Sequence, residues 1–140
     1  MSGGSQDIKD LKILVVEDQM ESRSMLRAML MELGIHQIFD SVNGQEALQF
    51  IDSAADLVDL VICDWNMPKM TGVELLRQLR SVGVDMPFLM ITGRADADSV
   101  LEAKACGVTG YISKPFSTQQ LEAKLRIVAH RMGDKAQKAS

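Results

Sequence analysis

The stretch VICDWNMPKMTG, residues 61–72, ends an apolar run on a carboxylate. Val61, Ile62 and Cys63 have the character of a buried strand, and Asp64 follows them directly. A tryptophan, an asparagine, a proline and a glycine come soon afterwards. Asp64 therefore either caps the next element or takes part in chemistry, and the rest of the chain has to decide between these two roles.

Short apolar runs of strand length alternate with helical patterns along the whole chain. The runs show little polar alternation, as expected for strands covered on both faces, and they occupy residues 12–16, 37–41, 59–63, 87–91 and 110–113. Apolar residues at helical spacing lie between and after them, around residues 25–33, 47–51, 75–82, 96–106 and 121–128. This order predicts a three-layer α/β/α sandwich, in which a five-stranded parallel sheet has helices on both faces.

Composition limits the classes of protein to consider. The 140 residues are 46% hydrophobic and 24% charged, which is typical of one soluble domain with a buried core. A net charge of -4 argues against nucleic acid as a partner. No apolar segment approaches the roughly 20 residues that span a bilayer, and the N-terminus lacks a signal-peptide core. We therefore expect a cytoplasmic protein with no membrane partner.

Two further features of the sequence give little information about function. Residues 1–10 are polar and rich in glycine and serine, which predicts a flexible leader. Cys63 and Cys106 lie far apart among apolar or small residues, so we expect two buried free thiols and no disulfide or metal site.

Polar side chains follow four of the five predicted strands. In open α/β sheets, ligands bind outside the carboxyl ends of the strands, so these side chains should share one edge. The second strand ends near Asp40 and Ser41 and adds nothing comparable. The side chains that the other strands deliver are Glu17 and Asp18, Asp64, Thr92, and Lys114.

Taken singly, each of these residues could be an ordinary helix cap or surface residue. Together, three carboxylates on one edge repel each other and need more positive charge than one lysine supplies. Oxygen ligands without histidine or thiolate indicate Mg²⁺, or Mn²⁺ in its place. A carboxylate beside such a metal, with a lysine and a hydroxyl nearby, can attack phosphorus as a nucleophile. The pattern predicts that Asp64 is a phosphoacceptor.

Four motifs in order, VVED, CDWNMPKMTG, ITG and YISKPF, resemble those of the receiver domain of bacterial response regulators. In length the chain is similar to stand-alone receivers of the CheY type. The resemblance covers residues 11–131, leaves residues 132–140 as a flexible tail, and implies the sheet order 2-1-3-4-5 that CheY exemplifies.

The resemblance also implies a role for each matching residue at the site. Asp64 matches the phosphorylated aspartate, and Asp18 matches the direct Mg²⁺ ligand, with Glu17 behind it. The backbone carbonyl of Asn66 completes the protein ligands of the metal, and its side chain tunes the phosphoryl lifetime. Lys114 matches the lysine that pairs with the phosphoryl group.

Two further matches concern the response to phosphorylation. Thr92 matches the hydroxyl that turns toward the phosphoryl group, and Tyr111 matches the aromatic whose inward or outward position reports the switch. The resemblance implies that the Lys114–Pro115 peptide bond is cis.

These matches imply a signalling switch in a two-component system. A histidine kinase or a histidine phosphotransfer protein would phosphorylate Asp64. The surface of the fourth helix, fifth strand and fifth helix would then change and regulate a target protein, with chemotaxis as one pathway. The chain would not be an enzyme beyond its own phosphorylation and autodephosphorylation, and it could be a monomer or a weak dimer.

Several alternatives stay open. Within the family, the chain could be a phosphorelay intermediate or a phosphate sink, or a phosphorylation-independent scaffold. A haloacid-dehalogenase-type phosphohydrolase would want a second aspartate where this chain has Asn66. A flavodoxin-like FMN binder would need hydroxyls and free amides where residues 17–23 are acidic.

Two positions depart from the usual pattern or vary within the family. Glu17 stands where the family more often has aspartate, which could alter metal geometry or affinity. Arg94, two residues after Thr92, occupies a variable position that tends to tune the phosphoryl lifetime.

We predict that Arg94 alters the rate of autodephosphorylation, because a cation near the site can hold or shield the phosphoryl group. The Arg94→Ala variant should lose its phosphoryl group at a different rate from the wild type, measured as decay of the phosphorylated protein after the donor is removed. Equal decay rates would contradict this role.

Overall fold

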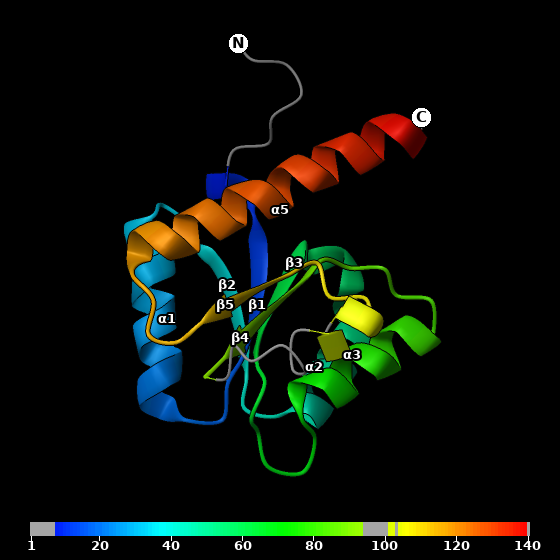
Figure 1. Cartoon of the computed structure of the whole chain (residues 1–140), viewed down its shortest axis with the longest axis horizontal. Helices are drawn as coiled ribbons and strands as arrows, with labels where there is room; N and C mark the ends of the chain where they lie inside the picture. Colours follow the sequence, from blue (N-terminus) through cyan, green and yellow to red (C-terminus); the bar gives the residue numbers. More distant parts are fainter. Residues whose placement is uncertain (1–7, 94–100, 103, 140) are drawn as a thin grey trace.

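The apolar runs form one parallel sheet in the computed structural model, which describes residues 8–93, 101, 102 and 104–139. All neighbouring strands pair in parallel in the order β2-β1-β3-β4-β5 (Figure 1), which confirms the predicted sheet. The strands are β1 (Lys12–Val16), β2 (Gln37–Ser41), β3 (Leu60–Asp64), β4 (Phe88–Thr92) and β5 (Gly110–Ser113).

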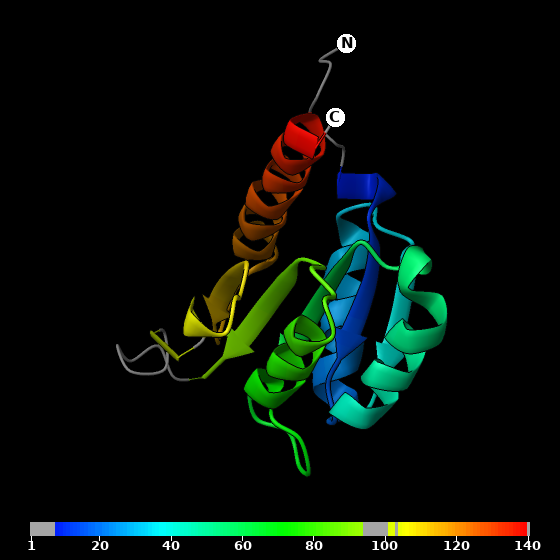
Figure 2. The same cartoon turned by 90° about the vertical axis from the view of Figure 1, so that its right-hand side faces the viewer.

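Helices cover both faces of this sheet. Figure 2 shows α1 and α5 on one face and α2 and α3 on the other, as the three-layer prediction requires. The fourth predicted helix lies largely outside the described residues, which are helical at 101, 102, 104 and 105. The helices with stated bounds are α1 (Met20–Glu32), α2 (Gly44–Ala54), α3 (Gly72–Ser81) and α5 (Thr118–Ala139), with 3-10 helices at Ile8–Asp10 and Ala55–Leu57.

The strands lack polar alternation because each packs against helices on both sides. In β1, Ile13 and Val15 face the core under α1 and α5, whereas Leu14 and Val16 face the core under α2 and α3. Both sets are fully buried, so the sequence reads as a continuous apolar run.

Local side-chain chemistry sets where several helices begin. Thr71 and Glu74 form a reciprocal capping box at the start of α3. Ser117 is the N-terminal cap of α5, because its hydroxyl accepts a hydrogen bond from the Gln120 N–H at 3.1 Å. Ser117 and Thr118 are both residue types that occur at helix N-termini, and the structure uses Ser117 as the cap.

Two of the strands, β3 and β4, and helix α5 differ from their predicted bounds. Both strands begin and end one residue later than predicted, so Asp64 and Thr92 are the last residues of strands and are buried. The backbone of α5 is helical to Ala139, where the sequence predicts a flexible tail from residue 132. Lysine, glutamine and alanine in that segment are good helix formers, which accounts for the difference.

Three further details bear on the sequence predictions. Cys63 is buried and free, as predicted, but Cys106 is only half-buried and its Sγ accepts a hydrogen bond from Arg77 Nε. The peptide bond between Lys114 and Pro115 is cis, as the resemblance implied. Among the described residues, no helix is long and apolar enough to cross a membrane.

Gly72 allows α3 to start directly against the end of β3. A Cβ atom at Gly72 would lie 2.6 Å from the backbone oxygen of Asp64 and 2.7 Å from Met90 Sδ. Its N–H donates to the carbonyl of Trp65 at 2.9 Å. This close approach fixes the backbone that carries Asp64.

We predict that Gly72→Ala lowers the free energy of unfolding by about 1–3 kcal/mol, because the added methyl group overpacks a backbone contact that cannot yield. Urea unfolding followed by circular dichroism would measure the loss. Gly93→Ala is the matched control, since a Cβ at Gly93 meets nothing within 4 Å. Equal unfolding midpoints for the two variants would contradict the steric argument.

Candidate functional site

Asp64 lies at the centre of the carboxyl edge of the sheet. Its side chain is buried, and Lys114 Nζ lies 3.2 Å from Oδ2. The other carboxylate oxygen, Oδ1, accepts a hydrogen bond from the Asn66 N–H at 3.3 Å. The site thus contains a buried carboxylate with a cation near one oxygen and a backbone donor on the other.

Lys114 reaches this position because it follows β5 directly. Its N–H donates to the carbonyl of Thr92 at 2.8 Å, which ties the end of β5 to the end of β4. The lysine side chain is 39% exposed, so its charge is shared between Asp64 and solvent. The ion pair therefore offsets only part of the negative charge at this edge.

Two more acidic residues lie beside Asp64. Glu17 and Asp18 follow β1, the neighbouring strand, and one carboxylate oxygen from each of the three residues lies within 4.8 Å of the others. Glu17 is buried and Asp18 is half-buried. The predicted convergence of Glu17, Asp18 and Asp64 is therefore present.

The surroundings of Glu17 shift its protonation. Burial, opposed by a hydrogen bond from the Gln19 N–H and reinforced by the neighbouring Asp64, raises the pKa of Glu17 to about 7. In the metal-free protein this carboxyl group is therefore partly protonated near neutral pH. Loss of hydration on burial is the main cause of this shift, and the proximity of Asp64 adds to it.

Burial also explains why the nearby thiol is inert. Burial, with Asp64 and Glu17 adding to the effect, raises the pKa of Cys63 well above its ordinary value. Since only a thiolate is a good ligand or nucleophile, Cys63 does not compete with the carboxylates for a metal.

The donor set fits a hard divalent cation. Carboxylate oxygens converge from two neighbouring strands, and Asn66 is exposed at the rim of the site. Mg²⁺ prefers one or two carboxylates and keeps several waters, which suits a half-open acidic site. Glu17, Asp18 and Asp64 could hold such an ion, and its charge would relieve their repulsion.

The remaining predicted residues differ in how far the structure places them. Thr92 ends β4 and is buried at the same sheet edge. Tyr111 is half-buried in β5, packs against the core under α2 and α3, and has Lys124 Nζ at 5.3 Å from its ring centre. Arg94 lies outside the described residues.

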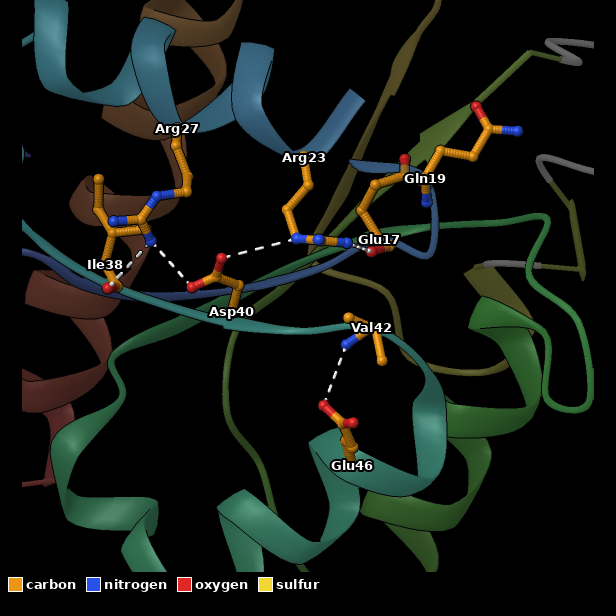
Figure 3. Close-up of polar contacts among 8 residues, drawn as sticks. All are labelled: Glu17, Gln19, Arg23, Arg27, Ile38, Asp40, Val42 and Glu46. Carbon is orange, nitrogen blue, oxygen red and sulfur yellow. Dashed lines mark hydrogen bonds and ion pairs between the residues drawn. The ribbon is translucent and has the colours of Figure 1, made fainter. Parts of the chain in front are cut away.

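Sequence reasoning missed an arginine that reaches the site from α1. Arg23 NH1 donates to the carbonyl of Glu17 at 2.9 Å, and its Nε lies 3.7 Å from Asp40 Oδ2 in β2 (Figure 3). The sequence predicts nothing comparable to the other polar side chains from the second strand, and Asp40 takes part only as the partner of Arg23. No local pattern could have revealed this, because Asp40 and Arg23 meet only when β2 pairs with β1.

The prediction from the sequence was also wrong about the burial of one methionine. Met25 belongs to the apolar stripe predicted for the first helix, but its side chain is 61% exposed. It lines a surface hollow with Leu26, Met29, Pro115 and Phe116, next to Glu17 and Lys114. The hollow opens beside the acidic site.

Fold and site together define a class of protein: a doubly wound α/β domain with a buried aspartate, a lysine and an acidic cluster at the carboxyl edge of its sheet. The family model described as the response regulator receiver domain matches residues 13–126. The chain belongs to this family, and it is a receiver of a two-component response regulator.

Curated relatives have similar lengths. The chain is 36% identical over 124 residues to the chemotaxis protein CheY of Pseudomonas aeruginosa, covering 87% of this chain and 98% of that protein. It is 37% identical over 120 residues to the chemotaxis protein CheY1 of Helicobacter pylori, covering 84% of this chain and 96% of that protein.

Solved structures of receivers are also similar to it. Vibrio cholerae chemotaxis protein CheY4 superposes with a TM-score of 0.77 at 33% identity, covering 84% of this chain and 98% of that one. A response regulator receiver domain protein from Clostridium thermocellum gives a TM-score of 0.80 at 26% identity, covering 87% and 96% of the two chains.

We predict that the metal-free protein loses stability as pH rises from about 4.5 to about 7, because the folded state holds a proton on Glu17 that the unfolded chain releases. Glu17→Gln should remove this contribution and raise the free energy of unfolding by about 1–3 kcal/mol at about pH 8. Urea unfolding in EDTA across this pH range would measure both effects.

Glu21→Gln, on the exposed surface of α1, controls for the loss of one negative charge. A Glu17→Gln variant with the same pH dependence as this control would show that burial of Glu17 does not strain the folded state.

Proposed function

We propose that this receiver works as a phosphorylation switch and that Asp64 is its phosphoacceptor. One observation carries the assignment. The Asp64 carboxylate is buried, lies 3.2 Å from Lys114 Nζ, and shares its site with Glu17 and Asp18. A structural ion pair would not need two further carboxylates beside it, whereas phosphoryl transfer needs both the nucleophile and a cation site.

In the transfer step, a carboxylate oxygen of Asp64 attacks the phosphorus of a phosphohistidine on a donor protein. The new P–O bond forms as the P–N bond to the donor imidazole breaks, and the imidazole nitrogen keeps the electron pair and takes up a proton. A histidine kinase or a histidine phosphotransfer protein would supply this group.

The residues of the chain would divide the electrostatic work. Mg²⁺, when bound by Asp18, Asp64 and the carbonyl of Asn66, supplies positive charge to the phosphoryl oxygens. Glu17 would support this metal site from next to the direct ligand Asp18. The Lys114 ammonium group would shift from the Asp64 carboxylate to an oxygen of the transferred phosphoryl group, on the side away from the acidic cluster.

The donor would approach over the hollow beside α1. Met25, Leu26, Met29 and Phe116 form an apolar surface that borders Lys114, so a partner covering it would shield the reacting groups from water. The exposed Met25 side chain would suit contact with the donor, because methionine is flexible and adapts to varied partner surfaces.

Phosphorylation would be read out on the opposite side of the sheet edge. Thr92 would turn toward the phosphoryl group, and Tyr111 would move into the space released, shifting a two-state equilibrium. The face around β5 and α5 has three cationic residues beside the exposed Ile127, and this combination suits an acidic partner with an apolar anchor; the cations are Lys104, Lys124 and Arg131.

A role in chemotaxis is the pathway we favour, because relatives of matching length carry that name. A relay intermediate or a phosphate sink would use the same site and differ in the partner that receives the phosphoryl group. In each case the chain acts stoichiometrically and turns over no separate substrate.

We expect a small donor such as phosphoramidate or acetyl phosphate, with Mg²⁺, to add one phosphoryl group to the wild-type chain. Intact-mass spectrometry would show the addition, and EDTA should prevent it. Asp64→Asn should abolish labelling, whereas Asp56→Asn, at an exposed position, should leave it unchanged.

Labelling of Asp64→Asn at the wild-type level would reject Asp64 as the acceptor. Continuous hydrolysis of a phosphate monoester would support the phosphohydrolase alternative. A chain that no donor labels would support a phosphorylation-independent scaffold.

A further inference from the structure

Arg23 connects three elements around the acidic site. It lies in the first turns of α1, donates through NH1 to the Glu17 carbonyl at the end of β1, and pairs through Nε with Asp40 of β2. Its side chain is only 17% exposed. Figure 3 shows the guanidinium between the Glu17 carbonyl and the Asp40 carboxylate. The two contacts use different nitrogens of one rigid fork.

Few other hydrogen bonds hold the loop that Arg23 contacts, and within the loop the Gln19 N–H donates to Glu17 Oε2 at 3.0 Å. Gln19 is the N-terminal cap residue of α1, yet its side chain makes no capping hydrogen bond. The Glu17 N–H donates to the Ser41 carbonyl at 3.1 Å, so one side of this residue is held by β2. Arg23 holds the other side of Glu17 through a hydrogen bond to its carbonyl oxygen.

The Glu17 carbonyl belongs to the same planar peptide unit as the nitrogen of Asp18. Because a peptide unit rotates as one rigid plane, a hydrogen bond to the Glu17 carbonyl oxygen also fixes the position of the Asp18 backbone nitrogen. Asp18 is one of the three acidic residues that converge on the candidate cation site. The contact of Arg23 with the Glu17 carbonyl therefore bears on the backbone position of Asp18.

Asp40 sets the direction of Arg23. Its Oδ1 accepts a hydrogen bond from Arg27 NH1 at 2.9 Å, and its Oδ2 faces Arg23 Nε. Arg27 NH1 also donates to the Ile38 carbonyl at 3.4 Å, but among the described residues no hydrogen bond or ion pair joins Arg27 to the loop after β1. The two arginines share one carboxylate, and Arg23 alone of the two reaches the loop.

We propose that Arg23, oriented by Asp40, is a positioning residue that sets the Asp18 loop for binding of a divalent cation. This inference rests on the cation site of the proposed function. It adds an arginine from α1 and an aspartate from β2 to the residues on which that site depends.

The direction of the change in cation affinity when Arg23 is replaced distinguishes a positioning role from a purely electrostatic one. Arg23 carries a positive charge near the site, so loss of that charge alone would strengthen binding of a cation. Loss of the positioning contact would weaken it. Arg23→Lys keeps the charge but cannot place two donors in the geometry of the guanidinium fork.

The test measures Mn²⁺ affinity directly, by counting free Mn²⁺ from its electron paramagnetic resonance signal during a titration. We expect Arg23→Ala to raise the dissociation constant about tenfold, as for other residues that orient metal ligands. Arg23→Lys should shift it in the same direction. Urea midpoints measured in parallel show whether each variant is folded.

Arg27→Ala is the matched control, because it removes the other arginine on Asp40 and leaves the Glu17 carbonyl contact in place. We expect its Mn²⁺ affinity to stay within about twofold of the wild type, as for a surface ion pair. Asp40→Asn should weaken binding in the wild-type background but not further in Arg23→Ala, because Asp40 acts through Arg23.

Unchanged or tighter binding in both Arg23 variants would overturn the inference, as would equal weakening in Arg23→Ala and Arg27→Ala. Those results would leave the cation site itself intact. A wild-type chain that binds no Mn²⁺ would reject both the cation site and the positioning role.

Discussion

The convergence of negative charge at the carboxyl edge of the sheet is the constraint on which this protein depends. One carboxylate oxygen from each of Glu17, Asp18 and Asp64 lies within 4.8 Å of the others. Two unit charges at that separation repel by about 3 kcal/mol at an effective dielectric constant of roughly 20. A fold pays for such an arrangement only where a cation or a reaction makes use of it.

The sheet holds this charge because its backbone cannot relax. Asp64 ends a strand that pairs on both sides, and Gly72 allows α3 to pack directly against its carbonyl. In this site, burial and the neighbouring Asp64 raise the pKa of Glu17, and Lys114 forms an ion pair with Asp64. Both features are expected to respond when a cation or a phosphoryl group enters, because each changes the local charge.

Much of the fold could be predicted because the signals were local. Five apolar runs gave five strands, and residues that follow four of them reached one edge. Strand ends were less predictable: Asp64 and Thr92 belong to their strands because a neighbouring strand still offers backbone partners there. Met25 has the spacing of a core residue, but its side chain is 61% exposed and lines a surface hollow beside Phe116.

The sequence by itself determined the parallel sheet, its three layers and the candidate acidic site, because strand polarity sends every carboxyl end to one edge. Only the tertiary structure decided how that site is held. The Arg23–Asp40 pair joins residues 17 positions apart in the chain across two elements, and it exists because β2 pairs with β1 while α1 packs beside them. Contacts of this kind depend on the register between elements, which no local pattern of residues encodes.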